Sequence, residues 1–257
     1  MGFSEYIEPI VAENYEVRLL ECQEELEEYQ RLRYEYLLKH FDADGSGREQ
    51  EYDIQGRDLN IGYDKANSSL CCFYIDPETK KRTIVGGYVL MRFRDDNTFC
   101  KAVVKCDMDK LLAKHKFQIL ELGRAVTHPD HRNGIVLKLL WAGMDAYAET
   151  HNLRYLIGTT NFTSLEPSEC THAYNYLQEN YLMDADIMVD VLPDKALYPE
   201  QIEVDRDIAI KQLPPILRGY LLIGAKVGRG LYVDNELQSL AIFTILDRQT
   251  LGRYRLR

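Results

Sequence analysis

The stretch from Glu121 to Leu140, ELGRAVTHPDHRNGIVLKLL, constrains the fold more than any other part of this 257-residue chain. Apolar and β-branched residues between Phe117 and Thr127 predict a strand, and Pro129 ends it. Apolar residues then recur at helical spacing, at Ile135, Leu139, Leu140 and Met144. The sequence therefore predicts a strand that is followed directly by a helix, with Arg132–Gly134 at the helix start.

The predicted helix start has the properties of an anion-binding site. A helix N-terminus exposes unpaired backbone N–H groups and carries a partial positive charge, so it suits a phosphate group. Gly134 has no side chain and lets a ligand approach the backbone closely. An ordinary helix start is the alternative, because many helices begin with Asn or Gly.

Motifs along most of the chain resemble those of the GNAT acyltransferase superfamily. The central motif is Glu121-Leu-Gly-Arg124-Ala-Val, then His128-Pro-Asp-His-Arg132-Asn-Gly134, and then an apolar helix. More narrowly, the segments 213–220 (LPPILRGY) and 224–234 are similar to the ornithine lipid synthase N-acyltransferases, a hemolysin-like branch that makes N-acylated amino acids. The resemblance covers roughly residues 16–250, which is nearly the whole chain.

The resemblance implies an α/β GNAT fold, with a mixed central sheet flanked by helices. It further implies an acyltransferase core in residues 1–200 and a basic C-terminal extension in residues 201–257. Residue patterns predict strands at Glu16–Leu20, Ser69–Ile75, Ile84–Phe93, Phe117–Thr127, Tyr155–Thr160, Asp186–Leu192 and Ala241–Leu246. They predict helices at Gln23–His40, from Gly134 onward, and near Glu169–Asn180.

The helix start also bears on the acyl donor. GNAT enzymes that use coenzyme A usually carry Arg-x-x-Gly-x-Gly/Ala here, whereas Arg132-Asn-Gly134-Ile-Val lacks the second small residue, so fewer amides would face a pyrophosphate. The ornithine lipid branch shares this short form and uses acyl carrier protein, whose phosphopantetheine has a single phosphate. The resemblance therefore implies an acyl carrier protein donor with a long 3-hydroxyacyl chain. The residues expected to hold its phosphate are His131, Arg132, Asn133 and Gly134.

Glu121 is the expected catalytic base. An α-amino group is mostly protonated near neutral pH, and a carboxylate can accept its proton directly or through water. Strand alternation places Glu121 on the same face as Gly123 and Ala125, which leaves space for a ligand beside it. The resemblance implies that Glu121 and Arg124 lie at the acyl or acceptor site. The alternative is a salt bridge from Glu121 to Arg124 or Arg33 that stabilises the sheet.

Arg33 and an aspartate further along the chain are the expected substrate-binding residues. Arg33 lies on the apolar stripe of its predicted helix, so it either snorkels or pairs with a buried carboxylate. The resembling families carry a similar Arg-aromatic helix over a donor pocket. Asp64 lies just before a predicted strand and competes with Asp53 as the residue that binds the ammonium group of the acceptor. An ordinary turn aspartate is the alternative.

No metal site is expected. The loop from Asp42 to Asp53 imitates a calcium-binding loop, but its eighth position is Glu49 and its twelfth is Asp rather than Glu. A polar loop is therefore the preferred interpretation. The six cysteines show no CxxC or His/Cys spacing, which favours reduced, buried thiols.

Charge is distributed unevenly along the chain. Residues 1–60 contain 16 acidic and 6 basic residues, whereas residues 211–257 contain 8 basic and 3 acidic residues. A basic C-terminal surface suits an acidic acyl carrier protein or an anionic membrane, and a solvated basic face is the plain alternative. No nucleic acid partner is expected. The chain has neither a long apolar run nor a secretory signal pattern, so the expected location is cytoplasmic or peripheral on the inner face of the membrane.

Together these inferences predict an N-acyltransferase of aminolipid biosynthesis. It would transfer a 3-hydroxyacyl chain from acyl carrier protein to the α-amino group of ornithine, with glycine or lysine as alternative acceptors and no permanently bound cofactor. The nearest rival is an acyl-homoserine-lactone-type signal synthase that uses S-adenosylmethionine. A coenzyme A-dependent acetyltransferase and a non-catalytic regulator that binds acyl carrier protein are further alternatives.

Overall fold

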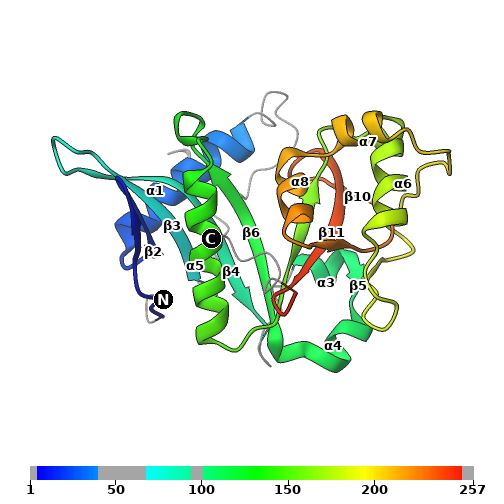
Figure 1. Cartoon of the computed structure of the whole chain (residues 1–257), viewed down its shortest axis with the longest axis horizontal. Coiled ribbons are helices and arrows are strands. Elements are labelled where there is room, and N and C mark those ends of the chain that lie inside the picture. The colour runs from blue at the N-terminus through cyan, green and yellow to red at the C-terminus, as the bar shows by residue number, and fades with distance from the viewer. Residues whose placement is uncertain (1–4, 40–67, 94–100, 251–257) are drawn as a thin grey trace. The chain divides into compact units, whose positions relative to one another are not determined.

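The computed structural model describes residues 5–39, 68–93 and 101–250. The chain forms two compact units (Figure 1). Unit 1 contains residues 1–92 and 122–153, and unit 2 contains residues 93–121 and 154–257. Strand β6 (Ile119–Thr127) contributes its first three residues to unit 2 and the others to unit 1.

Unit 1 is built on a sheet with the strand order β1-β2-β3-β4-β6. The first four strands pair antiparallel with their neighbours, and their bounds are β1 (Ile10–Ala12), β2 (Tyr15–Leu19), β3 (Ser68–Ile75) and β4 (Arg82–Arg92). Helix α1 (Gln23–Arg33) continues as a π-helix, η1 (Tyr34–Leu38). After β6, a short 3-10 helix, η4 (Pro129–His131), leads to α5 (Ile135–Thr150).

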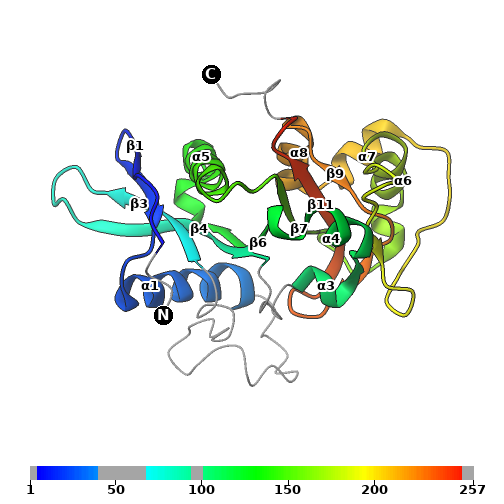
Figure 2. The same cartoon turned by 90° about the horizontal axis from the view of Figure 1, so that it is seen from below.

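Helices α1 and α5 cover opposite faces of this sheet (Figure 2). Two adjacent glycines in β4 allow both helices to approach. A β-carbon on Gly86 would lie 2.9 Å from Val136 Cγ1 of α5, and one on Gly87 would lie 2.7 Å from a ring carbon of Tyr29 of α1. Because successive strand residues point to opposite faces, each glycine removes a side chain from one of the two helix contacts.

Unit 2 contains a second group of paired strands. Residues Ile119–Glu121 of β6 pair in parallel with β7 (Tyr155–Asn161), and β7 pairs antiparallel with β11 (Ser239–Asp247). Strands β9 (Lys226–Val227) and β10 (Tyr232–Asp234) pair with β11, while β5 (Cys106–Asp107) pairs with β8 (Asp190–Val191). The helices are α3 (Lys101–Lys105), α4 (Asp109–His115), η3 (Lys116–Gln118), η5 (Pro167–Cys170), α6 (Thr171–Asn180), α7 (Arg206–Gln212) and α8 (Pro215–Leu222).

Alternate residues of β11 enter two different hydrophobic clusters. Ala241, Phe243 and Ile245 pack in a cluster to which α3 and α4 contribute. Leu240 and Ile242 pack in a second cluster with residues of α6, α7 and α8. Both faces of β11 are therefore covered, which explains why its residues Leu240–Phe243 are apolar in succession rather than alternating with polar ones.

The expected α/β architecture, a mixed sheet flanked by helices, is confirmed. Two expected elements differ in extent. The helix expected at Gln23–His40 changes to π geometry at Tyr34, and the strand expected at Asp186–Leu192 is reduced to Asp190–Val191. The apolar run before Asp190 instead fills the cluster beside α3 and α4 as irregular backbone. The division at residue 200 stays a prediction, although β11 beyond it pairs with β7, and β9 and β10 pair with β11.

Candidate functional site

The turn between β6 and α5, residues 128–134, is called the elbow here. Gly134 is the N-cap of α5 and has a φ of 83°, in the left-handed region, where glycine has no steric penalty. No atom lies within 4 Å of the position that a β-carbon would take there. Asn133 Oδ1 accepts a hydrogen bond from the Ile135 N–H at 3.0 Å. The predicted helix start at Arg132–Gly134 is thus confirmed, and its backbone is open on the side of Gly134.

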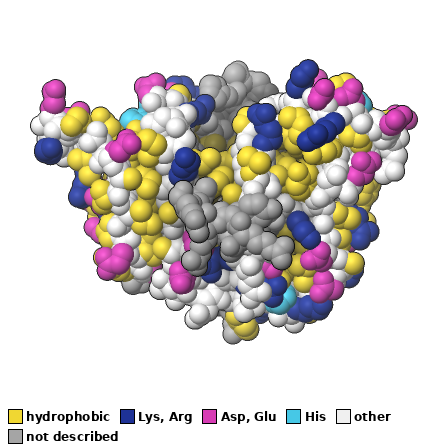
Figure 3. All heavy atoms as spheres, viewed as in Figure 1, with side chains coloured by type: hydrophobic (Ala, Val, Ile, Leu, Met, Phe, Trp, Pro, Cys, Tyr) yellow, Lys and Arg dark blue, Asp and Glu magenta, His cyan; other side chains and the backbone are white. Residues whose placement is uncertain are grey.

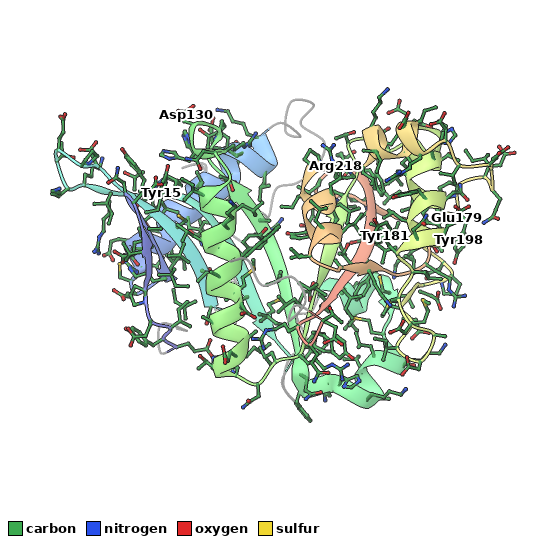
Figure 4. The ribbon with its side chains drawn as sticks, viewed as in Figure 1. Tyr15, Asp130, Glu179, Tyr181, Tyr198 and Arg218 are labelled. Atoms are coloured by element: carbon green, nitrogen blue, oxygen red, sulfur yellow. The ribbon has the colours of Figure 1, made fainter. Side chains whose placement is uncertain are left out.

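A polar chain connects the elbow with β2. Asn133 Nδ2 donates to the Tyr15 hydroxyl at 3.2 Å, and the same hydroxyl lies 3.0 Å from His131 Nδ1. Tyr15 is 6% exposed, whereas His131 is half-buried and Asn133 is exposed, so these contacts are partly shielded from water. The Tyr74 ring, on β3, packs against the His131 ring with 5.0 Å between the ring centroids. Figure 4 labels Tyr15 on β2 and Asp130 on the elbow.

A second polar chain connects the elbow with the π-helix. His128 Nδ1 accepts a hydrogen bond from the Asp130 N–H at 3.3 Å, and His128 Nε2 lies 2.9 Å from the Tyr36 hydroxyl. The centroids of the His128 and His131 rings are 5.7 Å apart. Two imidazoles with defined partners therefore stand side by side on the elbow.

Burial lowers the pKa of His131 below its ordinary value. The neighbouring His128 lowers it further, while Asp130 has the opposite effect. His131 is consequently neutral near neutral pH. Arg132 is exposed, and its Nε donates to the Thr127 carbonyl at 3.3 Å.

Glu121 lies in unit 2 and is buried, with 4% of its surface exposed. Its Oε1 accepts a hydrogen bond from the Ala102 N–H of α3 at 3.2 Å. Glu121 also lies close enough to Cys106 for its charge to reinforce the effect of burial, which raises the pKa of that thiol to about 12. The Glu121 carboxylate therefore contacts α3, whereas Gly123 and Ala125 are partly exposed, and the space expected for a ligand beside Glu121 stays a prediction.

Arg124 interrupts the regular geometry of β6 in unit 1. Its φ is 53°, in the left-handed region that β-strand residues normally avoid, so the expected alternation does not extend past it. The Tyr29 hydroxyl donates to the Arg124 carbonyl at 2.8 Å and holds this backbone. Tyr29 also carries the guanidinium of Arg33 over its ring, 4.9 Å from the centroid. Arg33 has no exposed surface, so the snorkelling interpretation is wrong.

The remaining predicted residues lie outside the described part of the chain. These are Asp64, Asp53 and the calcium-like loop that begins at Asp42. Within residues 5–39, 68–93 and 101–250, no group of three or more His, Cys, Asp or Glu side chains is arranged to hold a metal ion. In the same ranges, no helix has the length and apolar composition needed to cross a membrane.

The structure brings Arg33 and Arg124 together around Tyr29, and it brings His131, Asn133 and Gly134 together on the elbow. The sequence analysis missed Tyr15, Tyr36 and the pairing of the two histidines. Tyr15 is 116 positions away from His131 and Tyr36 is 92 positions away from His128, so no local pattern links them.

Comparison with known proteins agrees with this architecture. Residues 32–142 match the family model of the acetyltransferase (GNAT) domain. The L-ornithine N(alpha)-acyltransferase of Rhodobacter capsulatus is 25% identical over 251 residues, which cover 93% of this chain and 92% of that protein. The protein of the same name from Agrobacterium fabrum is 28% identical over 255 residues, covering 93% and 83%.

Among solved structures, FeeM, an N-acyl amino acid synthase from uncultured soil microbes, aligns with a TM-score of 0.51 at 12% identity. The alignment covers 96% of this chain and 93% of FeeM and concerns the fold. Residues 32–142 thus match a GNAT acetyltransferase domain, and most of the chain is similar to proteins named L-ornithine N(alpha)-acyltransferase.

Proposed function

We propose that this acyltransferase moves a 3-hydroxyacyl chain from acyl carrier protein to the α-amino group of ornithine. The observation that carries the proposal is the similarity to relatives named L-ornithine N(alpha)-acyltransferase, which extends over 93% of the chain. Glycine and lysine are the alternative acceptors. The product would be an N-acylated amino acid of aminolipid biosynthesis.

The elbow supports a donor that carries a phosphate. Gly134 leaves the N-terminus of α5 open, and the exposed Arg132 lies beside it. Backbone N–H groups and a cationic side chain are the groups that bind phosphate. The short elbow suits the single phosphate of phosphopantetheine better than the pyrophosphate of coenzyme A.

The reaction needs a free amine and a stabilised oxyanion. The amine nitrogen attacks the thioester carbonyl, and the tetrahedral intermediate then expels the pantetheine thiolate. In the proposed mechanism Glu121 accepts the proton that the amine loses and returns it, directly or through water, to the leaving thiolate, while backbone N–H groups of β6 stabilise the oxyanion. Arg124 would orient the acyl or acceptor group, and Arg33 and either Asp64 or Asp53 would contribute to acceptor binding.

Glu121 has a structural role that must be separated from its proposed catalytic role. Its carboxylate accepts the Ala102 N–H, so an alanine at this position would remove both a base and a partner of α3. Glu121→Gln keeps an amide oxygen that can accept the same hydrogen bond, but glutamine cannot act as a base. The pair of variants therefore distinguishes catalysis from folding.

Mass spectrometry of lipid extracts tests the proposal. A bacterial host that expresses the wild type is expected to accumulate an N-acylated ornithine, and the host with Glu121→Gln is expected to lose it while the protein remains folded. Loss of one general base typically lowers a rate by about 10²- to 10⁴-fold. Full activity of Glu121→Gln would contradict the proposed role of Glu121 as a base, but it would leave the proposed acyl transfer to ornithine intact.

The products also discriminate between the alternatives. An acyl-homoserine lactone that requires S-adenosylmethionine would replace the ornithine proposal with a signal synthase. Soluble wild-type protein that binds acyl carrier protein but yields no acylated amine, either in the host or with purified donor and ornithine, would contradict the proposed activity.

A further inference from the structure

We propose that Tyr15 is a positioning residue of the donor elbow. Its hydroxyl aligns the Asn133 amide and fixes His131 in the tautomer that carries its hydrogen on Nε2, so that the elbow presents hydrogen-bond donors to the donor's phosphate. The inference rests on the proposed function, because it concerns a donor that carries phosphopantetheine.

The direction of each hydrogen bond follows from its neighbours. The Ile135 N–H can only donate, so the Asn133 atom 3.0 Å from it is the amide oxygen. The Asn133 atom 3.2 Å from the Tyr15 hydroxyl is then the NH₂ group, which also can only donate. The Tyr15 oxygen accepts this bond and retains its own hydrogen for another acceptor.

That acceptor is His131 Nδ1. Among the described residues, the Tyr15 hydroxyl contacts only Asn133 and His131, and Tyr15 is 6% exposed. Because this position is partly shielded from water, a Tyr15 hydroxyl hydrogen that did not bond to His131 would lose a nearby acceptor at 3.0 Å. A neutral imidazole that accepts at Nδ1 carries its hydrogen on Nε2. Burial keeps His131 neutral by lowering its pKa.

The neighbouring histidine adopts the same tautomer. His128 Nδ1 accepts the Asp130 N–H, so His128 carries its hydrogen on Nε2 and donates to Tyr36. The hydrogen of the Tyr36 hydroxyl is then available for a further acceptor. The two chains therefore end in donors, His131 Nε2–H and the Tyr36 O–H. An array of donors favours an oxyanion over a neutral ligand.

Tyr15→Phe removes the hydroxyl but keeps the ring. The centroid of this ring lies 5.5 Å from that of Tyr74 and 5.8 Å from that of His131. Asn133 and His131 then lose the group that orients them. Tyr74→Phe is the matched control. It removes a hydroxyl from the adjacent ring, and that hydroxyl has no hydrogen-bond partner in the part of the chain that the structure describes.

The first experiment is isothermal titration calorimetry with two probes, 3-hydroxymyristoyl-phosphopantetheine and 3-hydroxymyristoyl-pantetheine. The wild type and Tyr74→Phe are expected to bind the phosphorylated probe more tightly than the dephosphorylated one. Tyr15→Phe is expected to lose about tenfold in affinity for the phosphorylated probe alone, as for a lost charge-assisted hydrogen bond. No loss, or an equal loss for both probes, overturns the proposal.

The second experiment observes His131 directly by long-range proton–nitrogen correlation NMR of the imidazole nitrogens. The wild type and Tyr74→Phe should show hydrogen on Nε2, whereas Tyr15→Phe should show a mixture of tautomers. Hydrogen on Nδ1 in the wild type overturns the proposal. This readout is independent of catalysis, so a failure of the ornithine assignment would appear in the lipid extracts without changing the spectra.

Discussion

Arg124 shows how one residue can carry strain at a place where function is expected. A non-glycine residue with a φ of 53° costs roughly 1–2 kcal/mol, and such residues persist only where surrounding contacts fix them. Here the fixing contact is the hydrogen bond from the Tyr29 hydroxyl to the Arg124 carbonyl. The same ring lies under Arg33, so one tyrosine holds both arginines that the sequence analysis selected.

This strain predicts an inverted order of stability between two variants. Arg124→Gly and Arg124→Ala both remove the side chain, but only glycine relieves the left-handed backbone. We expect the glycine variant to be more stable than the alanine variant by about 1 kcal/mol, opposite to the usual preference within a strand. Urea denaturation of the two variants measures the difference, and an alanine variant of equal or greater stability would contradict the prediction.

Local and distant signals explain which site residues the sequence could predict. Asn133 and Gly134 were predictable because a helix start depends on neighbouring residues. Tyr15 and Tyr36 were not, because their imidazole partners come from distant parts of the chain. The complete burial of Arg33 was also beyond prediction, since an arginine on an apolar stripe is compatible with both snorkelling and burial.

Contacts between whole elements in unit 1 are set by the glycines of β4. Gly86 faces Val136 of α5. A β-carbon added to Gly86 would lie 2.9 Å from Val136 Cγ1. Real β-carbons do not approach another atom this closely, so the helix or the strand must shift when a methyl group is introduced. The distance between β4 and α5 is therefore specified by the absence of one side chain.

A double-mutant cycle tests this specification. Gly86→Ala is expected to destabilise the protein by about 1–3 kcal/mol through overpacking. In the background of Val136→Ala, the same substitution should cost less, because the Val136 methyl group that it would meet is gone. Thermal or chemical denaturation of the four proteins gives the coupling. Strictly additive effects would show that the contact does not limit the approach of α5.

A buried ion pair joins β2 to α1. Arg18, with 6% of its side chain exposed, contacts Glu25 and Glu16 and lies 4.2 Å above the Phe73 ring. Burial alone would raise the pKa of Glu25, but hydrogen bonds from Arg18 and from the Glu21 N–H more than offset it and hold this pKa below its ordinary value of 4.5. The folded state thus binds this proton more weakly than the unfolded state.

The pKa of Glu25 predicts a component of acid sensitivity. The stabilisation is complete above the unfolded-state pKa and is lost as the pH falls through the lower folded-state pKa. We expect Glu25→Gln to lower stability at neutral pH and to flatten the loss of stability below about pH 4.5. Glu24→Gln, at the exposed neighbouring position in the same helical turn, is the control. If the wild type and Glu25→Gln lose the same stability as the pH falls below about 4.5, Glu25 does not contribute to acid sensitivity.

Apolar strands were predictable, whereas several short elements of unit 2 were not. The strands at Ser68–Ile75, Arg82–Arg92 and Ser239–Asp247 contain enough apolar residues for a pattern to emerge. The elements β9, β10, α7 and α8 contain one or two helical turns or a few strand residues and show no such pattern. Their positions depend on packing against other parts of unit 2, which a local pattern does not contain.

At the scale of the whole molecule, the basic C-terminal segment is less positive than its composition suggests. Lys226 pairs with Asp184 at 2.7 Å, and Arg229 pairs with Asp190 at 3.3 Å. Lys211 and Arg218, on α7 and α8, are exposed and form no ion pair within the described ranges. Figure 3 shows basic side chains interspersed with hydrophobic ones over this part of unit 2, and Figure 4 labels Arg218 there.

This distribution predicts which charges steer an acidic donor. Lys211→Gln combined with Arg218→Gln is expected to slow association with acyl carrier protein by about three- to tenfold at low salt, and the difference should shrink as salt is added. Lys226→Gln is the matched control, because its charge is already paired with Asp184. Stopped-flow association kinetics at several ionic strengths measure the effect. A larger effect from Lys226→Gln would assign the steering to a different surface.

The division of β6 between the two units has a consequence for synthesis on the ribosome. Unit 1 is discontinuous, since its sheet begins with residues 1–92 but its last strand and α5 arrive only with residues 122–153. Until then, the face of β2, β3 and β4 that α5 covers lacks its helix, and apolar residues such as Val17 and Leu70, which contact Gly143 of α5, remain uncovered. Nascent chains halted before residue 153 should therefore recruit chaperones more strongly than chains halted after it, because only the later ones can bury this face.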